Sequence, residues 1–474
     1  IEIFTKSYRD GEKGVHWVSD GNSTYTIGDA DIKTRGTKIV MHLAPEEKEF
    51  TDEKVIKKLL AKYCSFMPYP IYLNPKATDK ELKPVNTTAP LYLKQPADCT
   101  EEEYQNFYRD TFHDFNAPLF WIHLNMEYPF RLKGILYFPK VKKQVELERG
   151  QVKLYCNQVF IADNIKEVIP EFLQLLNGVI DCPDIPLNVS RSFLQNDKQV
   201  QKISKHITKK VADKLVALFR DDREKFNNCW PDIATFVKFG CIKDDDFYGK
   251  VSDIIVFKNL AGEYMPVSGY LGEEITEEQA KEGKEPQAVY YVSDESKQAQ
   301  YIKMFKDAGL DAILCDTYID PHFISYLEYK NPKRVRFLRI DADVANALKE
   351  ESSEDGDLKK IFETALEGKN VTIKTEKLKD ASVPAVVNVS EFMRRMSEMN
   401  SFYMMGNGPQ DVTLIVNTAN PAVQALKDAQ SEAQNTAANQ IYLLALMNYK
   451  PLTSEELTAF TATSVALLEK YLKK

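Results

Sequence analysis

Residues 288–340 read AVYYVSDESKQAQYIKMFKDAGLDAILCDTYIDPHFISYLEYKNPKRVRFLRI, and they show a regular alternation of two kinds of pattern. Three apolar runs in it are typical of strands, and two helical patterns separate them. The strands are expected at 288–292, 311–316 and 334–340, and the helices at 296–308 and 321–329. Strands that alternate with helices form parallel sheets with right-handed crossovers, so we predict a small parallel β-α-β-α-β unit. No G-x-G-x-x-G follows its first strand, which favours a packing unit over a dinucleotide site.

The beginning of the chain carries short β-rich runs separated by Gly, Asp and Asn, which are turn residues. We predict antiparallel strands at 1–4, 15–18, 24–27 and 35–43. A helix is expected next, because Thr51 or Asp52 can cap a segment whose apolar residues have helical spacing. Prolines and alternating charges between residues 74 and 88 are typical of an interdomain linker.

A second region begins with the capping box Thr100-Glu101-Glu102-Glu103, which predicts the start of a helix. Five aromatic residues are expected on one face of this helix: Tyr104, Phe107, Tyr108, Phe112 and Phe115. Strands are predicted at 130–138 and 153–159. A long helix is predicted from about Ser190, because apolar residues then repeat every three or four positions. They are Phe193, Leu194, Val200, Ile203, Ile207, Val211, Leu215 and Phe219.

The last part of the chain follows an acidic, polar stretch at 349–357. Strands are predicted near 371–375, 383–389 and 412–417, with a helix from Ser390 and two terminal helices separated by Pro451. The apolar residues of these terminal helices suit a bundle shared between two copies of the chain. They are Ile441, Leu444, Leu457, Phe460, Val465 and Leu468.

The chain length predicts about three domains. We predict a multidomain protein of the α+β and α/β classes. The domains are expected at 1–73, 89–340 and 341–474, with the linker at 74–88.

Composition limits the class of protein. The 474 residues are 43% hydrophobic and carry a net charge of -8, so the chain has no general attraction to nucleic acid or anionic lipid. The seven cysteines are widely spaced without a C-x-x-C pair, which is typical of thiols in a reducing compartment. No apolar run approaches the roughly 20 residues of a membrane span, and no signal peptide begins the chain. We expect a cytoplasmic protein without nucleic-acid, membrane or metal sites.

The segment 185–195 has the residues of a phosphate receptor. Asn188 or Ser190 can cap the helix that follows, and Arg191 and Gln195 share its first turn. A helix N-terminus presents N–H groups and a partial positive charge, so a guanidinium added there suits a phosphate. We hypothesise that Arg191 stabilises charge on a transferring γ-phosphate. A plain surface ion pair of Arg191 is the open alternative. The chain contains no P-loop, H-E-x-x-H or G-x-S-x-G motif.

Two apolar features suit contacts with other proteins. Trp121 lies near the predicted aromatic helix, where an exposed ring would hold apolar segments and a buried ring would be a core residue. A Met-rich helix face is the second feature, because thioethers adapt their shape on promiscuous binding surfaces. It comprises Met393, Met396 and Met399, followed by Phe402. A Met-filled core is the equal alternative for this segment.

Three ordered stretches carry a resemblance to a known family: KLYCNQVFIAD at 153–163, IPEFL at 169–173, and GVID at 178–181 continuing to residue 195. They are similar, nearly residue for residue, to the middle domain of the ninety-kilodalton heat-shock chaperone family, especially its bacterial high-temperature protein G branch. The tripeptide Arg35-Gly36-Thr37 resembles the end of the family's ATPase domain. The Met393 to Met396 segment resembles the start of its C-terminal domain, so the resemblance covers essentially the whole chain.

This resemblance implies an ATP-dependent chaperone that holds client proteins in a dimeric clamp. It implies the end of a histidine-kinase-like ATPase domain, an α/β middle domain and a small mixed C-terminal domain with a helical dimerisation bundle. Helices at about 437–473 would form the homodimer. ATP and Mg²⁺ would be bound mainly by an N-terminal domain that the sequence does not include.

Site residues follow from the same resemblance. Arg191 would contact the γ-phosphate, with Asn188 and Gln195 assisting in the same loop. Thr37 would lie at the adenine end of the nucleotide pocket. Trp121 and the Met-rich face with Phe402 would contact unfolded or partly folded clients.

The departures from the family pattern limit these expectations. The catalytic Glu helix, the Asp-x-Gly-x-Gly turn and the glycine-rich lid of the ATPase domain do not occur, and the chain begins at Ile1 without Met. We therefore expect a fragment that alone does not bind ATP tightly. The segment 139–152 is short and charged, without the aromatic loop of many relatives. The chain end lacks the acidic tail of eukaryotic members, so tail-docking cochaperones are not expected.

Two other functions remain as alternatives. A DNA-handling relative of the same ATPase superfamily, of the topoisomerase or mismatch-repair type, would use a Lys on the γ-phosphate and need a basic surface. Here the candidate is Arg191 and the charge balance is acidic. The other alternative is a scaffold without ATPase activity.

Overall fold

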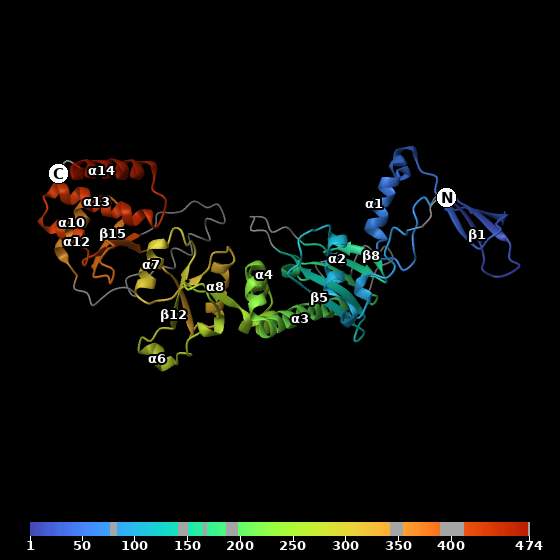
Figure 1. The fold of residues 1–474 in the computed structure, drawn as a ribbon, viewed down its shortest axis with the longest axis horizontal. Helices are drawn as coiled ribbons and strands as arrows, with labels where there is room; N and C mark the ends of the chain where they lie inside the picture. The colour runs from blue at the N-terminus through green and yellow to red at the C-terminus, as the bar shows by residue number, and fades with distance from the viewer. Residues whose placement is uncertain are drawn as a thin grey trace.

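The computed structural model describes residues 1–75, 83–140, 150–164, 168–185, 198–341, 354–388 and 412–472. Its sheets and helices follow one another in chain order along an elongated molecule, with the two chain ends at opposite ends (Figure 1). The fold is a multidomain mixture of helices and sheets, as predicted. The boundaries of the predicted domains at residues 73, 88 and 340 stay predictions.

The N-terminal part is a four-stranded antiparallel sheet in the order β3-β2-β1-β4. The strands are β1 (Glu2–Lys6), β2 (Gly14–Val18), β3 (Thr26–Ala30) and β4 (Gly36–Val40). This confirms the predicted strands, with the third one shifted towards higher numbers. Helix α1 (Glu53–Tyr63) follows, and the carboxylate of Asp52 caps it by accepting from the amide of Lys54 at 2.8 Å.

A five-stranded sheet in the order β5-β6-β9-β7-β8 forms the centre of the next part. Its strands are β5 (Phe120–Met126), β6 (Leu132–Phe138), β7 (Val152–Cys156), β8 (Val159–Asp163) and β9 (Asn177–Asp181). The central strand β9 is antiparallel to β6 and parallel to β7. Alternate residues of the sheet pack on opposite sides, because successive strand residues point to opposite faces. Tyr137 and Val179 join the core of helix α2 (Glu101–Phe112), whereas Leu136 and Ile180 join the core of α3 (Lys198–Asp221).

The predicted capping box is confirmed at the start of α2. The Thr100 hydroxyl accepts from the amide of Glu103 at 3.3 Å, and the Glu103 carboxylate accepts from the amide of Thr100 at 2.9 Å. The prediction for Phe115 was wrong. The helix ends at Phe112, and His113 adopts a left-handed φ of 55°, so Phe115 lies beyond the helix with 87% of its surface exposed.

The predicted strand at 153–159 is confirmed over residues 153–156, but its end was wrong, because the chain turns after Cys156 and a second strand begins at Val159. The chain reverses between β7 and β8 at Asn157 and Gln158, whose φ angles of 51° and 65° are left-handed. Such angles close a tight hairpin, and Asn tolerates them better than most residues. The prediction missed this turn because it contains no Gly or Pro.

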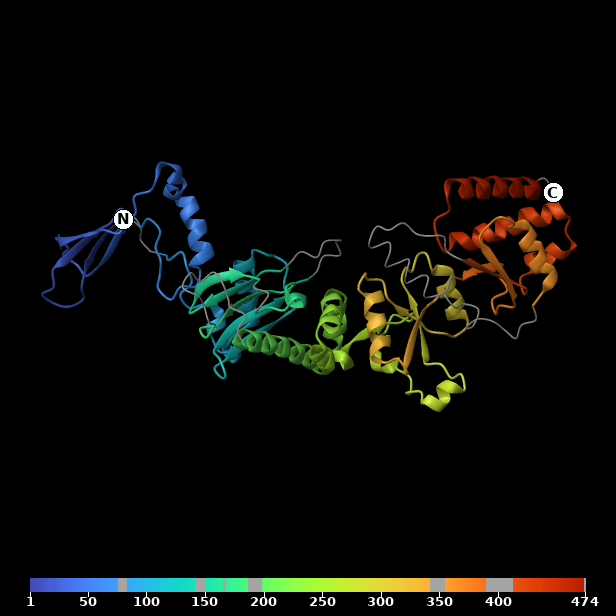
Figure 2. The ribbon, with the colours of Figure 1, turned by 180° about the vertical axis from the view of Figure 1, so that it is seen from behind.

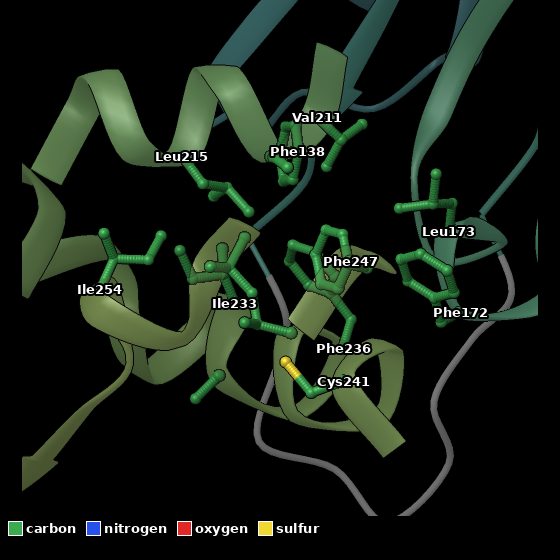
Figure 3. Packing of buried hydrophobic residues seen from close by; sticks show 14 of the residues in the cluster. Phe138, Phe172, Leu173, Val211, Leu215, Ile233, Phe236, Cys241, Phe247 and Ile254 are labelled. Atoms are coloured by element: carbon green, nitrogen blue, oxygen red, sulfur yellow. The ribbon is translucent and has the colours of Figure 1, made fainter. Parts of the chain in front are cut away.

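Three helices pack on the face of the five-stranded sheet opposite α2: α3, α4 (Arg223–Lys243) and α5 (Asp245–Val251). The buried residues of α3 include Val200, Ile203 and Ile207, which confirms the predicted apolar stripe from Val200 onwards. The predicted helix start at Ser190, with Phe193 and Leu194, lies outside the described residues. Figure 3 shows Leu215 of α3, Phe236 of α4 and Phe247 of α5 in one apolar cluster. Gly240 lets these elements approach closely, since a Cβ there would lie 2.7 Å from the Phe172 ring.

The predicted β-α-β-α-β unit is confirmed as a parallel sheet in the order β13-β12-β14. It consists of β12 (Gln287–Val292), α7 (Ala299–Asp307), β13 (Ile313–Leu314), α8 (Asp320–Lys330) and β14 (Val335–Arg339). The short hairpin of β10 (Val256–Lys258) and β11 (Tyr264–Pro266) precedes it, with helix α6 (Glu277–Lys281) between. A buried ion pair between Lys238 and Asp320 connects α4 to the start of α8.

The C-terminal part contains a three-stranded sheet in the order β15-β17-β16. Its elements are α10 (Gly356–Ala365), β15 (Val371–Glu376), β16 (Ala385–Asn388), β17 (Val412–Asn417), α12 (Pro421–Gln424), α13 (Ser431–Met447) and α14 (Ser454–Leu472). The three predicted strands and two terminal helices are confirmed, and the predicted helix from Ser390 lies outside the described residues. Both views show α13 and α14 side by side (Figures 1 and 2). Val386 and Ile415 share a core with Tyr301 and Phe305 of α7, so this mixed sheet packs against the parallel unit.

Candidate functional site

The candidate phosphate segment lies between two well-anchored elements. Strand β9 precedes it and helix α3 follows it, and buried residues of both belong to one core cluster. Residues 186–197 lie outside the described residues, and so do the candidate residues Asn188, Arg191 and Gln195. Their proposed contacts with phosphate therefore stay predictions.

The last residues before this segment are fixed by an ion pair and by burial. Arg131 holds Asp184 in a forked contact, with its Nη2 at 2.8 Å and its Nε at 3.3 Å from Oδ1. The hydrogen bonds from Arg131 lower the pKa of Asp184 below its ordinary value. The next residue, Ile185, is buried in the core. The chain thus leaves the sheet towards Arg191 from a fixed position.

A buried carboxylate lies at the end of β9. Oδ2 of Asp181 accepts from the amide of Gln158 at 2.8 Å and from the hydroxyl of Tyr92 at 3.3 Å. Burial raises the pKa of Asp181 above its ordinary value, against the opposite effect of these donors. Oδ1 of Asp181 has no hydrogen-bond partner among the described residues. This cluster joins β9, the β7–β8 turn and the segment before α2.

Trp121 is neither fully buried nor fully exposed. It lies on β5 and stacks on Tyr104 of α2, with 4.7 Å between ring centroids and 25° between ring planes. Tyr104 is itself fixed by a 2.7 Å hydrogen bond between its hydroxyl and Nδ1 of His123. Burial lowers the pKa of His123, which favours the neutral ring. The indole is therefore held on one face and keeps part of its surface accessible.

Thr37 lies on the edge strand β4 and is exposed. Its hydroxyl is 2.8 Å from the hydroxyl of Thr5 on β1. The strand presents Thr37 at the surface, and the predicted contact with an adenine stays a prediction. The Met-rich face and Phe402 fall within 389–411, outside the described residues, so the predictions for Met393, Met396, Met399 and Phe402 also stay predictions.

The terminal helix α14 has no buried residue, although it is rich in apolar side chains. It contacts α13, where Nε2 of Gln440 donates to the hydroxyl of Ser464 at 2.8 Å. Four apolar residues on one side of α14 are exposed: Leu457 at 51%, Val465 at 49%, Leu468 at 59% and Leu472 at 80%. Exposed apolar stripes of this kind mark interaction surfaces.

The described ranges contain no group of three or more His, Cys, Asp or Glu side chains that could hold a metal ion. The described residues thus offer no cluster of this kind for Mg²⁺. Within the same ranges, no helix combines the length and the apolar character needed to cross a membrane.

The sequence analysis did not identify two exposed aromatic residues as candidate contact residues. Phe115 and Tyr128 are each 87% exposed, one before β5 and one in the turn after it. Pro129 follows Tyr128, and a proline after an aromatic residue is a turn signal that could have placed Tyr128 at the surface. Phe115 carries the helical spacing of a core residue, so no signal in the sequence separates it from Phe112.

Comparison with known proteins gives consistent matches. A family model described as Hsp90 protein matches residues 74–470. The chain is similar to chaperone protein HtpG of Porphyromonas gingivalis, with 38% identity over 468 residues, covering 93% of this chain and 68% of the relative. A chaperone protein htpG of Bacteroides fragilis is 38% identical over 466 residues, covering 92% and 68%. The HtpG protein of Alcanivorax borkumensis is 30% identical over 430 residues, covering 87% and 68%.

Proposed function

Because this chain belongs to the Hsp90 protein family, in its bacterial HtpG branch, we propose that the protein is an ATP-dependent molecular chaperone. In this proposal a homodimer holds unfolded or partly folded client proteins, and ATP hydrolysis resets the clamp. ATP and Mg²⁺ would be bound mainly by residues N-terminal to this chain. The protein would work in the cytoplasm.

The observation that carries this proposal is the continuous family match over residues 74–470. The three relatives named above are all chaperone proteins, and each is matched over at least 87% of this chain. No observation favours the DNA-handling alternative or the ATPase-free scaffold.

Within this function, Arg191 is proposed to contact the γ-phosphate, with Asn188 and Gln195 assisting. The anchoring of β9 and α3 in one core supports this role, because a cation stabilises a transition state best when its support is rigid. The forked contact of Arg131 with Asp184 adds a fixed point three residues after β9 ends. Thr37 is proposed to lie at the adenine end of the nucleotide site.

Client contacts are proposed at Trp121 and at the Met-rich face of Met393, Met396 and Met399, with Phe402. The accessible part of the Trp121 ring supports the first of these, since a stacked, rigid aromatic surface binds apolar segments at little entropic cost. The homodimer is proposed to form through α13 and α14, and the exposed stripe on α14 supports this.

The test of this function is ATP turnover by a longer protein that includes the nucleotide domain. Arg191→Ala is expected to lower turnover by about a thousandfold, as removal of an arginine finger does in other phosphoryl-transfer systems. The matched control is Arg220→Ala near the far end of α3, where Arg220 pairs with its exposed neighbour Asp221. Turnover of the control should stay within twofold of the original protein.

The outcome distinguishes the proposed role of Arg191 from the proposed chaperone function. A large loss in Arg191→Ala with unchanged dimerisation supports Arg191 as the phosphate contact. Turnover that is equal in both variants assigns Arg191 to a surface ion pair and removes the proposed role. A longer protein that neither hydrolyses ATP nor prevents client aggregation would overturn the chaperone function itself.

A further inference from the structure

The ends of two adjacent strands bring two cysteines side by side. In the parallel pair of β7 and β9, Tyr155 is the register partner of Asp181. The next residues on each strand are Cys156 and Cys182, and the amide of Cys182 donates to the carbonyl of Tyr155 at 3.0 Å. Neighbouring strands lie roughly 4.8 Å apart. This spacing falls within the roughly 4.4–6.8 Å between Cα atoms that a disulfide spans.

Both thiols also point to the same face of the sheet. Two residues earlier on each strand, Leu154 and Ile180 pack in the core beneath α3, and side chains alternate along a strand. Cys182 belongs to that core. Sγ of Cys156 lies 3.8 Å from the carbonyl oxygen of Pro183, the residue after Cys182. The Cys156 thiol is therefore directed across to β9.

The two thiols differ in accessibility. Cys182 is fully buried, and burial, with a smaller effect of nearby Cys156, raises its pKa to about 12. Cys156 keeps part of its surface exposed. An oxidant from solution would reach Cys156 first, and Cys182 would react second from inside the core. None of the seven cysteines, all within the described residues, forms a disulfide in this structure.

We propose that Cys156 and Cys182 form a redox modification site, at which a hydroperoxide converts the two thiols into a disulfide in the folded protein. The Cys156 thiolate attacks one oxygen of the peroxide, the O–O bond breaks, and water or an alcohol leaves. The sulfur of Cys182 attacks the resulting sulfenic acid, the S–O bond breaks, and the thiol proton of Cys182 leaves with the hydroxyl as water. Two electrons pass from the sulfurs to the peroxide, and a dithiol reductant reverses the reaction.

The disulfide would cross-link β7 to β9 at the point where the chain continues towards Arg191. Only two residues separate Cys182 from Ile185, where the candidate phosphate segment begins. Oxidation is therefore expected to lower ATP turnover of the longer protein. This consequence rests on the proposed function, whereas formation of the disulfide does not.

The test is disulfide mapping of this chain after treatment with hydrogen peroxide. The protein is alkylated, digested without reductant and measured by mass spectrometry. A linked peptide joining Cys156 to Cys182 is expected, with loss of two of the seven titratable thiols. Dithiothreitol should restore both. Retention of all seven thiols, or linkage to other cysteines only, overturns the proposal.

Single-cysteine variants test which thiols form the linked peptide. Cys156→Ser and Cys182→Ser should each abolish the linked peptide, whereas Cys241→Ser, buried on α4, should keep it. The mapping of the original protein decides the proposal even if Cys182→Ser unfolds. In the longer protein, a formed disulfide with unchanged turnover overturns the effect on ATP hydrolysis and leaves the modification site in place. Loss of turnover without a disulfide overturns the proposed link between the two.

Discussion

The central sheet buries its apolar side chains, whereas the terminal helix leaves its own exposed. Both faces of the five-stranded sheet are covered, by α2 on one side and α3 on the other. Helix α14 has no buried residue and leaves Leu468 59% exposed and Leu472 80% exposed. The chain completes its own core in the first region and leaves an apolar surface exposed in the second. Substitutions should therefore change folding stability in the first region and association in the second.

The largest effect on stability is expected at the buried ion pair of the central region. The side chains of Lys238 and Asp320 are 5% and 1% exposed, and Lys238 also lies 4.9 Å from the Phe257 ring centroid. Lys238→Met leaves Asp320 buried without its cation, which should lower the free energy of unfolding by about 3–5 kcal/mol. Urea unfolding followed by fluorescence of Trp230 on α4 measures this, with Trp17 and Trp121 replaced by Phe.

Two further variants test whether burial causes the effect of Lys238→Met. Adding Asp320→Leu should recover most of the loss, because an apolar pair of similar size replaces the ion pair. Lys330→Met removes a surface pair with Asp245, whose side chain is 73% exposed, and should cost only about 0–1 kcal/mol. Equal effects of Lys238→Met and Lys330→Met would contradict the importance of burial here.

The second prediction concerns the exposed stripe on α14. Leu457→Asp combined with Leu468→Asp should raise the dimer dissociation constant at least about a hundredfold, since burying each Leu contributes about 1.5–3 kcal/mol. The unfolding free energy of the separated chain should change little, because neither residue is buried. Sedimentation equilibrium measures the constant. Ala466→Asp, an exposed position on the opposite side of α14, is the control and should keep the dimer.

A smaller effect is expected at the N-terminus of α2. Thr100→Ala removes the side-chain acceptor for the amide of Glu103 and should lower the free energy of unfolding by about 1 kcal/mol. Thr100→Ser keeps the acceptor and should be nearly neutral. The same urea experiment measures both, and equal stability of the Ala and Ser variants would show that the cap contributes nothing.

The smallest effect concerns pH. Burial raises the pKa of Asp181, so the folded protein holds this proton more tightly than the unfolded chain does. The free energy of unfolding therefore falls as pH rises from about 4, the ordinary pKa of Asp, through the raised pKa. Asp181→Asn removes the titrating group, so the variant's free energy of unfolding should rise relative to that of the original protein as pH increases from about 4 through the raised pKa of Asp181.

A neighbouring carboxylate supplies a control of opposite sign. Arg131 lowers the pKa of Asp184, so this group adds stability above the ordinary pKa of Asp, and that stability is lost as pH falls. Asp184→Asn should therefore lose stability relative to the original protein at neutral pH. Unfolding curves of the two variants across the acid range should diverge in opposite directions. Parallel curves would contradict the assigned pKa shifts.

Much of the fold could be predicted because local patterns and tertiary packing agree. The capping box at Thr100 and the stripe on α3 each follow from spacing alone, and the alternation after residue 287 predicts the parallel unit. Helix α4 was not predicted, since it is buried on most sides and contains Pro231, so no one-sided stripe marks it. The β7–β8 turn was missed because Asn157 and Gln158 carry its left-handed angles without Gly.

The candidate site could be predicted only in part. A helix N-terminus and a guanidinium describe a phosphate receptor, but the spacing of residues does not show which other groups would hold the phosphate opposite Arg191. The exposure of Trp121 could not be predicted either, because it depends on the stacking of Tyr104 from another element. The apolar residues of α14 were predicted for a bundle, and spacing alone does not say whether their partner is this chain or a second copy.

The most direct test of the contrast between the two regions is the mass of this chain in solution, measured by sedimentation over a series of concentrations. A dimer with twice the 54.3 kDa of one chain is expected, with dissociation on replacement of Leu457 and Leu468 by Asp. A monomer of 54.3 kDa at every concentration would contradict the assignment of α14 to a second copy of the chain, and with it the dimeric clamp.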